Sequence, residues 1–166
     1  MTATPEFSRT LAVERIGPGG LVQSLAATPA ECAALARRFA IPAVLSLTAT
    51  FRLARGEAGR IAASATLTGR LTRECVVSLE PFETDIAESF AVAFVPEETL
   101  GEAVDLAGED EIPYAGNVID LGEATAEQVA LTLDPYPKRP GVVLPAAATD
   151  APDSPFASIG EQLRRH

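Results

Sequence analysis

Two neighbouring segments of strict alternation constrain the fold of this chain more than any other feature. Between residues 45 and 53 apolar side chains alternate with Ser, Thr and Arg, and the same pattern returns between residues 61 and 68. A period of two is typical of a strand with one buried face. Gly56 and Gly59 mark a short connection between the two segments. The pair therefore predicts an antiparallel hairpin.

Two helices are predicted from their starting signals. A Thr-x-x-Glu capping box at Thr28, followed by Pro29 at the first helical position, predicts a helix over 29–39. An Asp-x-x-Glu box at Asp120 predicts a second helix over about 121–133.

Shorter strands are expected elsewhere. We expect strands near residues 7–14, over 75–79, and over 86–94, the last ended by a proline. Gly69 is expected to mark a bend or bulge, since the alternation loses phase after it.

Strands outnumber helices and follow one another in sequence, so we predict an α+β fold. Its sheet is expected to be mainly antiparallel, with strong curvature allowed, and about two helices are expected to pack on it. The predicted domain covers 1–139, with 97–116, which hold seven carboxylates, as an exposed loop. Residues 140–154 are rich in Pro and Ala and predict a flexible linker. Residues 155–166 have the spacing of a short terminal helix that docks on the domain or on a partner.

The sequence holds little that indicates catalysis. Its single histidine is the last residue, His166, and no phosphate-binding glycine motif is present. Cys32 and Cys75 are too few for a disulfide framework and are expected to be buried, inert thiols. Neither a secretory signal nor an apolar run of about 20 residues occurs. We predict a cytoplasmic protein with no enzymatic activity, cofactor, metal or membrane contact; a hydrolase that uses carboxylates stays as an alternative.

Charge is distributed very unevenly along the chain. The net charge is −10, which argues against a general nucleic-acid binder. Residues 1–73 hold nine arginines against four carboxylates, whereas residues 74–137 hold sixteen carboxylates and neither Lys nor Arg. Solubility alone is one explanation. The other is that the acidic part faces a basic partner.

The basic part allows only limited contact with RNA. Three of its arginines are expected near the hairpin turn and two others about ten residues further along, and no exposed aromatic side chain stands between them. The candidate RNA contacts are Arg52, Arg55, Arg60, Arg70 and Arg73.

Several short motifs occur in a recognisable order. Arg-Glu-Cys-Val-Val-Ser-Leu-Glu-Pro-Phe spans 73–82, Asp-Leu-Gly-Glu spans 120–123, Asp-Pro-Tyr-Pro spans 134–137, and Pro-Phe-Ala begins at Pro155. Over roughly 60–163 this order resembles the YceD family of bacterial proteins, most of all its alphaproteobacterial branch. The resemblance implies a role in the accumulation of large-subunit ribosomal RNA and does not imply an enzyme.

The sequence departs from the family pattern at two places. Ser78 stands where a second cysteine is usual, and 138–140 lack the further cysteines of some members, so we expect no zinc site. Leu79 and Phe82 are expected in the core, on either side of a rigid Glu-Pro turn. Alternatively, the motif residues form an edge that binds a partner; this candidate surface comprises Glu80, Phe82, Asp134, Tyr136 and Phe156.

Together these features predict a non-catalytic ribosome-biogenesis factor. We expect 74–137 to engage a basic ribosomal protein and the arginines to give limited contact with large-subunit RNA. The alternative is a small binding module for an unrelated protein or a small ligand.

Overall fold

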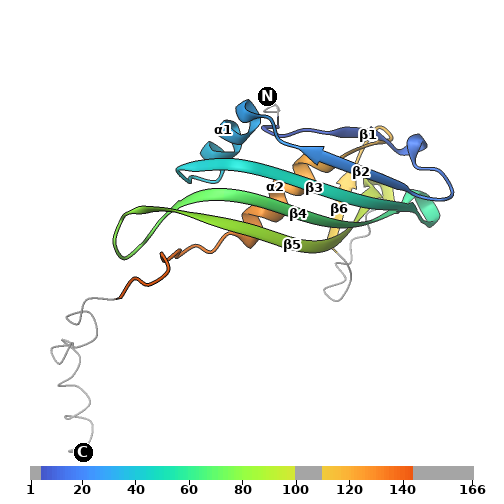
Figure 1. Ribbon diagram of the computed structural model, residues 1–166. Coiled ribbons are helices and arrows are strands. Elements are labelled where there is room, and N and C mark those ends of the chain that lie inside the picture. Colours follow the sequence, from blue (N-terminus) through green and yellow to red (C-terminus); the bar gives the residue numbers. More distant parts are fainter. Residues whose placement is uncertain (1–4, 100–109, 144–166) are drawn as a thin grey trace, which may run out of the picture.

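The computed structural model describes residues 5–99 and 110–143. Within these residues a five-stranded sheet has the strand order β2-β3-β4-β5-β6. All its neighbours are antiparallel except β5 and β6, which are parallel. The predicted α+β class with a mainly antiparallel sheet is confirmed (Figure 1). The strands are β2 (Leu21–Ala26), β3 (Ala43–Arg55), β4 (Ile61–Glu74), β5 (Pro81–Pro96) and β6 (Asp110–Tyr114).

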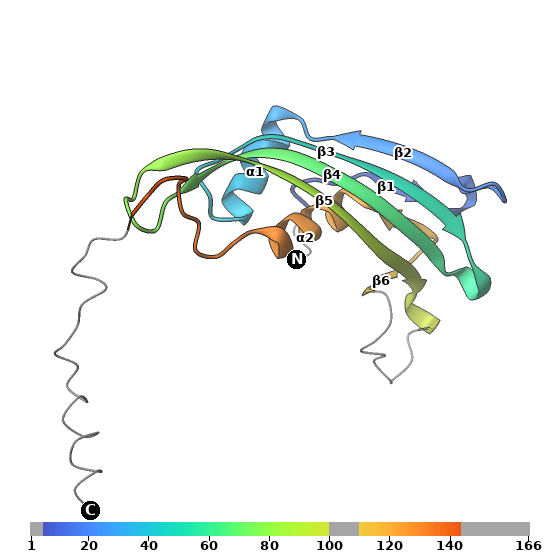
Figure 2. The same ribbon diagram turned by 60° about the horizontal axis from the view of Figure 1, so that its bottom comes forward.

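The sheet curves around its buried face, and α2 (Leu121–Thr132) lies across the concave side (Figure 2). A helix, α1 (Pro29–Arg38), connects β2 to β3 and packs chiefly against β3. The concave face of the sheet is apolar, with Phe51, Leu67 and Phe94 fully buried. Two short strands, β1 (Thr10–Ala12) and β7 (Val118–Asp120), pair beside this core. Both helices and the sheet thus share one hydrophobic core.

The predicted hairpin is confirmed as β3 and β4, joined by a 3-10 turn over Glu57–Gly59. Both helices are also confirmed, and their ends follow from their caps. Thr28 accepts the N–H of Glu31 at 3.3 Å, and the Glu31 carboxylate accepts the N–H of Thr28 at 2.8 Å. Asp120 caps α2 in a similar way, but Glu123 does not complete that box; its carboxylate pairs with Arg38 of α1 at 2.6 Å.

The bend or bulge expected at Gly69 does not occur there. β4 keeps its alternation of buried and exposed residues through Arg73, which occupies an inward position that apolar patterning does not predict. The register shift lies on β3 instead, between Val44 and Ser46. Gly69 pairs with strands on both sides, and a Cβ there would lie 3.0 Å from the Ser46 carbonyl. The glycine is therefore explained by close packing and not by a bend.

Other expected boundaries are wrong. Residues 75–79 form the turn between β4 and β5, and β5 begins at Pro81, earlier than predicted. β2 was not predicted, because Val22 and Ala26 place apolar side chains on its exposed face and blur the alternation. The strand expected near 7–14 is only the three residues of β1.

The segment expected as an acidic loop over 97–116 includes structure. A 3-10 turn spans Glu97–Thr99, and β6 pairs in parallel with the end of β5. Most of the predicted linker over 140–154 and all of the predicted docking segment over 155–166, including Phe156, lie outside the described residues. The proposed division into domain, linker and docking segment therefore stays a prediction.

Candidate functional site

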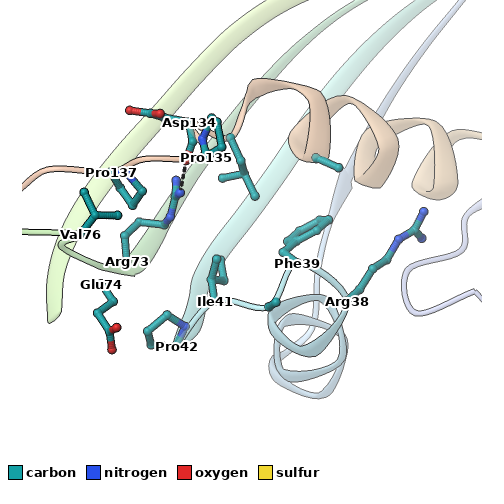
Figure 3. Close-up of a pocket in the computed structure, with 13 residues that line it drawn as sticks. Arg38, Phe39, Ile41, Pro42, Arg73, Glu74, Val76, Asp134, Pro135 and Pro137 are labelled. Atoms are coloured by element: carbon teal, nitrogen blue, oxygen red, sulfur yellow. Dashed lines mark hydrogen bonds between the residues drawn. The ribbon is translucent and has the colours of Figure 1, made fainter. Parts of the chain in front are cut away.

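A groove of about 530 Å³ opens at one end of the sheet, where four separate parts of the chain meet (Figure 3). These parts are the end of α1, the end of β4, the turn that follows β4, and the segment after α2. Apolar side chains form most of the lining: Phe39, Ile41, Pro42, Val76, Ala130, Leu133, Pro135 and Pro137.

Arg73 connects two of the chain segments that line this groove. It faces inward from β4 with only 8% of its surface exposed. Its guanidinium donates a hydrogen bond to the backbone carbonyl of Asp134, just beyond α2 (Figure 3). A buried guanidinium needs such acceptors because it loses its hydration. The end of β4 is thereby fastened to the segment that leaves α2.

Further hydrogen bonds hold the Asp-Pro-Tyr-Pro segment in place. The Asp134 carboxylate accepts the backbone N–H of Tyr136 at 2.8 Å, which forms an Asx turn. The N–H of Val76 donates to the carbonyl of Pro137 at 2.9 Å. Arg139, which follows this segment in the chain, forms an ion pair with Glu80 at 2.9 Å. The two motif segments, far apart in sequence, thus form one wall of the groove.

Exposed apolar side chains stand on the chain segments that line this groove, and we call them its apolar margin. Leu79 is 70% exposed and Tyr136 is 71% exposed, and Val76 and Leu131 are also exposed. The expectation that Leu79 lies in the core is wrong: its φ of +57° turns the chain sharply, and its side chain points to solvent. Phe82 is half-buried beside Arg73, its partner in the β4–β5 ladder. An apolar groove with an apolar margin is suited to contact with another molecule.

The thiol of Cys75 is buried beneath this turn, at a turn position and not on the strand that was expected. Backbone N–H groups, first that of Arg139 and then those of Ser78 and Val77, lower the pKa of this thiol to about 6. By contrast, burial in α1 raises the pKa of Cys32. The expected burial is confirmed for both thiols, but Cys75, unlike Cys32, lies among donors that stabilise a thiolate.

No group of three or more His, Cys, Asp or Glu side chains in the described part of the chain is placed to hold a metal ion. The groove itself presents mostly apolar surface, with the buried Arg73 and with Arg38, Glu74 and Asp134 as its other charged residues. Such an arrangement is fitted to binding another molecule.

A family model described as "Large ribosomal RNA subunit accumulation protein YceD" matches residues 63–154. The chain belongs to the YceD family. The match covers most of β4, all of β5 and α2, and both motif segments that line the groove. The family description supports a role in the accumulation of large-subunit ribosomal RNA. No curated protein and no solved structure matches the chain. Among the described residues, no helix is both long and apolar enough to span a membrane.

Of the five residues predicted as a partner surface of this YceD-family chain, Asp134 lines the groove, and Glu80, Phe82 and Tyr136 lie on the segments next to it in the chain. Glu80 and Phe82 follow the β4–β5 turn, and Asp134 and Tyr136 follow α2. Phe156 lies outside the described residues. Sequence reasoning missed the groove wall formed by Phe39 and Ile41, since those residues look like ordinary core at the end of a helix.

The five arginines predicted to contact RNA do not form one surface. Arg52 lies on the convex face and makes no ion pair or hydrogen bond to other described residues. The others have protein partners: Arg55 donates to the carbonyl of Val13, Arg60 pairs with Glu111, Arg70 pairs with Glu83, and Arg73 donates to the carbonyl of Asp134. Arg73 is only 8% exposed and its guanidinium is engaged with the Asp134 carbonyl, so it offers little surface to RNA.

Proposed function

We propose that this chain promotes the accumulation of large-subunit ribosomal RNA in the cytoplasm as a non-catalytic binding factor. The observation that carries the proposal is the convergence of the two motif segments, 73–82 and 134–137, on one apolar groove. The exposed side chains of Leu79 and Tyr136 at its margin supply the contact area for a partner protein.

The partner we infer is a basic ribosomal protein. The part of the chain that forms β5, α2 and the β4–β5 turn contains sixteen carboxylates over residues 74–137 and neither Lys nor Arg. Opposite charge speeds association and disfavours wrong partners. Direct contact with RNA would be limited, with Arg52 as its main candidate and Arg55, Arg60 and Arg70 as contributors only if their present contacts are exchanged.

The test is complementation in cells depleted of the protein. A variant with Leu79→Ser and Tyr136→Ala removes apolar surface at the groove margin without touching the core. Val22→Ser is the matched control, because Val22 is also an exposed apolar residue (59%) but lies on β2.

We expect the control to restore the ratio of large-subunit to small-subunit ribosomal RNA and the double variant to leave it low. Normal large-subunit RNA in depleted cells would overturn the proposed role, and full restoration by the double variant would overturn the role of the groove. Affinity capture that recovers no ribosomal component would favour an unrelated binding module.

A further inference from the structure

The first part of β5 is an open edge of the sheet. β6 pairs with β5 only from Val92 to Pro96, and within the described residues no strand lies beside Pro81–Ala91 on that side (Figure 1). At about 3.3 Å per residue, this edge is roughly 36 Å long. An open strand edge is a template for pairing with another chain.

The register identifies the backbone groups that face outward. The N–H of Cys75 donates to the carbonyl of Glu80 at 3.0 Å, in the same register as the β4–β5 ladder. Residues in antiparallel pairs alternate between facing their partner strand and facing away. Even-numbered residues of β5 therefore face β4. The N–H and C=O groups that point to the open side belong to Glu83, Asp85, Ala87 and Ser89.

This edge has few of the features that prevent strand addition. The β4–β5 register is uninterrupted over fourteen pairs, so there is no bulge, and after Pro81 the open part contains neither proline nor lysine. Its charges are carboxylates alone, at Glu83, Asp85 and Glu88. Like charges would face each other if two copies paired through this edge, which is unfavourable.

The two faces of the edge differ in chemistry. On the convex face, Glu83 and Asp85 share one arginine, Arg70, at 2.9 and 3.8 Å. Two carboxylates against one guanidinium leave a negative surface for an added strand. On the concave face, Phe82, Ile86 and Phe90 are half-buried and expose part of their apolar surface beside the edge. The exposed carboxylate of Glu88 lies on the same face, between Ile86 and Phe90.

We propose that the open edge of β5 binds an extended basic segment of a partner protein by strand addition. Backbone hydrogen bonds supply affinity in this mode, and alternate side chains supply specificity. The segment carries Lys or Arg on the face beside Glu83 and Asp85, and apolar side chains on the face beside Ile86 and Phe90. This inference rests on the proposed function only in taking the partner to be a basic protein.

The test uses the full chain and a peptide of about eight residues that alternates Lys and Val, which spans roughly 27 Å when extended. We expect binding in fluorescence anisotropy and new hydrogen-exchange protection of the Asp85, Ala87 and Ser89 amides, which face outward. A Glu-Val peptide of the same length should not bind. Equal binding of both peptides, or protection that appears elsewhere, would overturn the proposal.

A variant pair isolates the backbone contribution. Ala87→Pro removes an outward N–H without breaking the β4–β5 ladder, whereas Ala87→Val keeps the N–H and is the matched control. We expect Ala87→Pro to bind the peptide at least about tenfold more weakly, the effect of losing one or two hydrogen bonds. Thermal unfolding of both variants checks the fold. If Ala87→Pro is unstable, the hydrogen-exchange measurement on the unaltered chain still tests the proposal.

Two outcomes point to other conclusions. If the chain dimerises and Ala87→Pro makes it monomeric, a second copy occupies the edge and the proposal is overturned. The Leu79→Ser and Tyr136→Ala variant should bind the peptide normally, because neither residue belongs to β5 or to its open edge. Edge binding and groove function therefore fail or succeed separately.

Discussion

The guanidinium of Arg73 donates a hydrogen bond to the backbone carbonyl of Asp134, and this contact joins the end of β4 to the segment that leaves α2. The two residues are separated by 61 positions in the chain. Each belongs to one of the two motif segments, and both segments lie within the residues that the YceD family model matches. The contact therefore shows how two motifs distant in sequence produce one surface.

Arg73→Met should destabilise the protein by about 1–3 kcal/mol, since the Asp134 carbonyl loses a charged donor in a buried place. Arg70→Met is the control: Arg70 is on the same strand, but its side chain is 57% exposed and makes surface ion pairs. Its loss should cost about 1 kcal/mol or less. Urea unfolding measures both free energies. Equal effects would contradict a special role for Arg73.

Cys75 should titrate near neutral pH. Hydrogen bonds from the backbone N–H groups of Arg139, Ser78 and Val77 lower the pKa of the folded thiol to about 6. An unfolded cysteine has a pKa of about 8.5. Thiolate absorbance at increasing pH should therefore rise with a midpoint near 6. Cys75→Ala should abolish that transition, and Cys32→Ala should leave it unchanged, because burial raises the pKa of Cys32.

The same shift predicts a pH dependence of stability. A depressed folded-state pKa adds stability that is complete above the unfolded pKa and is lost as pH falls toward the folded value. The free energy of unfolding should therefore increase between pH 6 and about 8.5, and Cys75→Ala should flatten this slope. An unchanged slope in that variant would assign it to another group.

Glu31 should contribute to stability in acid. The Arg9 guanidinium contacts its carboxylate at 2.6 and 2.8 Å and, with the cap at Thr28, lowers the pKa of Glu31 to about 2. This contribution is complete above the unfolded pKa of about 4.3 and is lost as pH falls toward 2. Glu31→Gln should reduce the loss of unfolding free energy, measured by urea unfolding, between pH 4 and about 2. Arg9→Met should do the same. An unchanged pH dependence of the unfolding free energy in both variants would refute the pairing.

Gly122→Ala should destabilise the protein, although alanine is ordinarily the better helix former. A Cβ at Gly122 would lie 2.6 Å from the carbonyl of Phe7 and 2.8 Å from the N–H of Arg9, both backbone groups. We expect a cost of about 1–3 kcal/mol from overpacking. Gly19→Ala is the control, since its Cβ would meet no atom within 4 Å. Thermal unfolding of the two variants separates them, and equal stability would argue against close approach of the amino-terminal segment.

The local elements were predictable because their signals are contained in short stretches of chain. The capping box at Thr28 defines the start of α1, and the alternation over 45–53 and 61–68 defines the hairpin. The order of the motifs also predicted the family. Periodicity and capping depend on neighbouring residues, so the sequence alone was enough to reveal them.

The candidate site could be predicted only in part. Glu80, Phe82, Asp134 and Tyr136 were predicted from the motifs, but the contact that joins their two segments involves Arg73. The inward position of Arg73 looks like a loss of phase when only apolar residues are counted. The exposure of Leu79 follows from a left-handed turn that no local pattern indicated.

What the sequence determined by itself was the class of fold, the helices, the central hairpin and the imbalance of charge. Only the tertiary structure decided that β6 pairs in parallel with β5, that the rest of the β5 edge stays open within the described residues, and that two motif segments form one groove. These features depend on contacts between residues far apart in the chain. Short-range patterns do not encode such contacts, because packing and register are settled by the whole core at once.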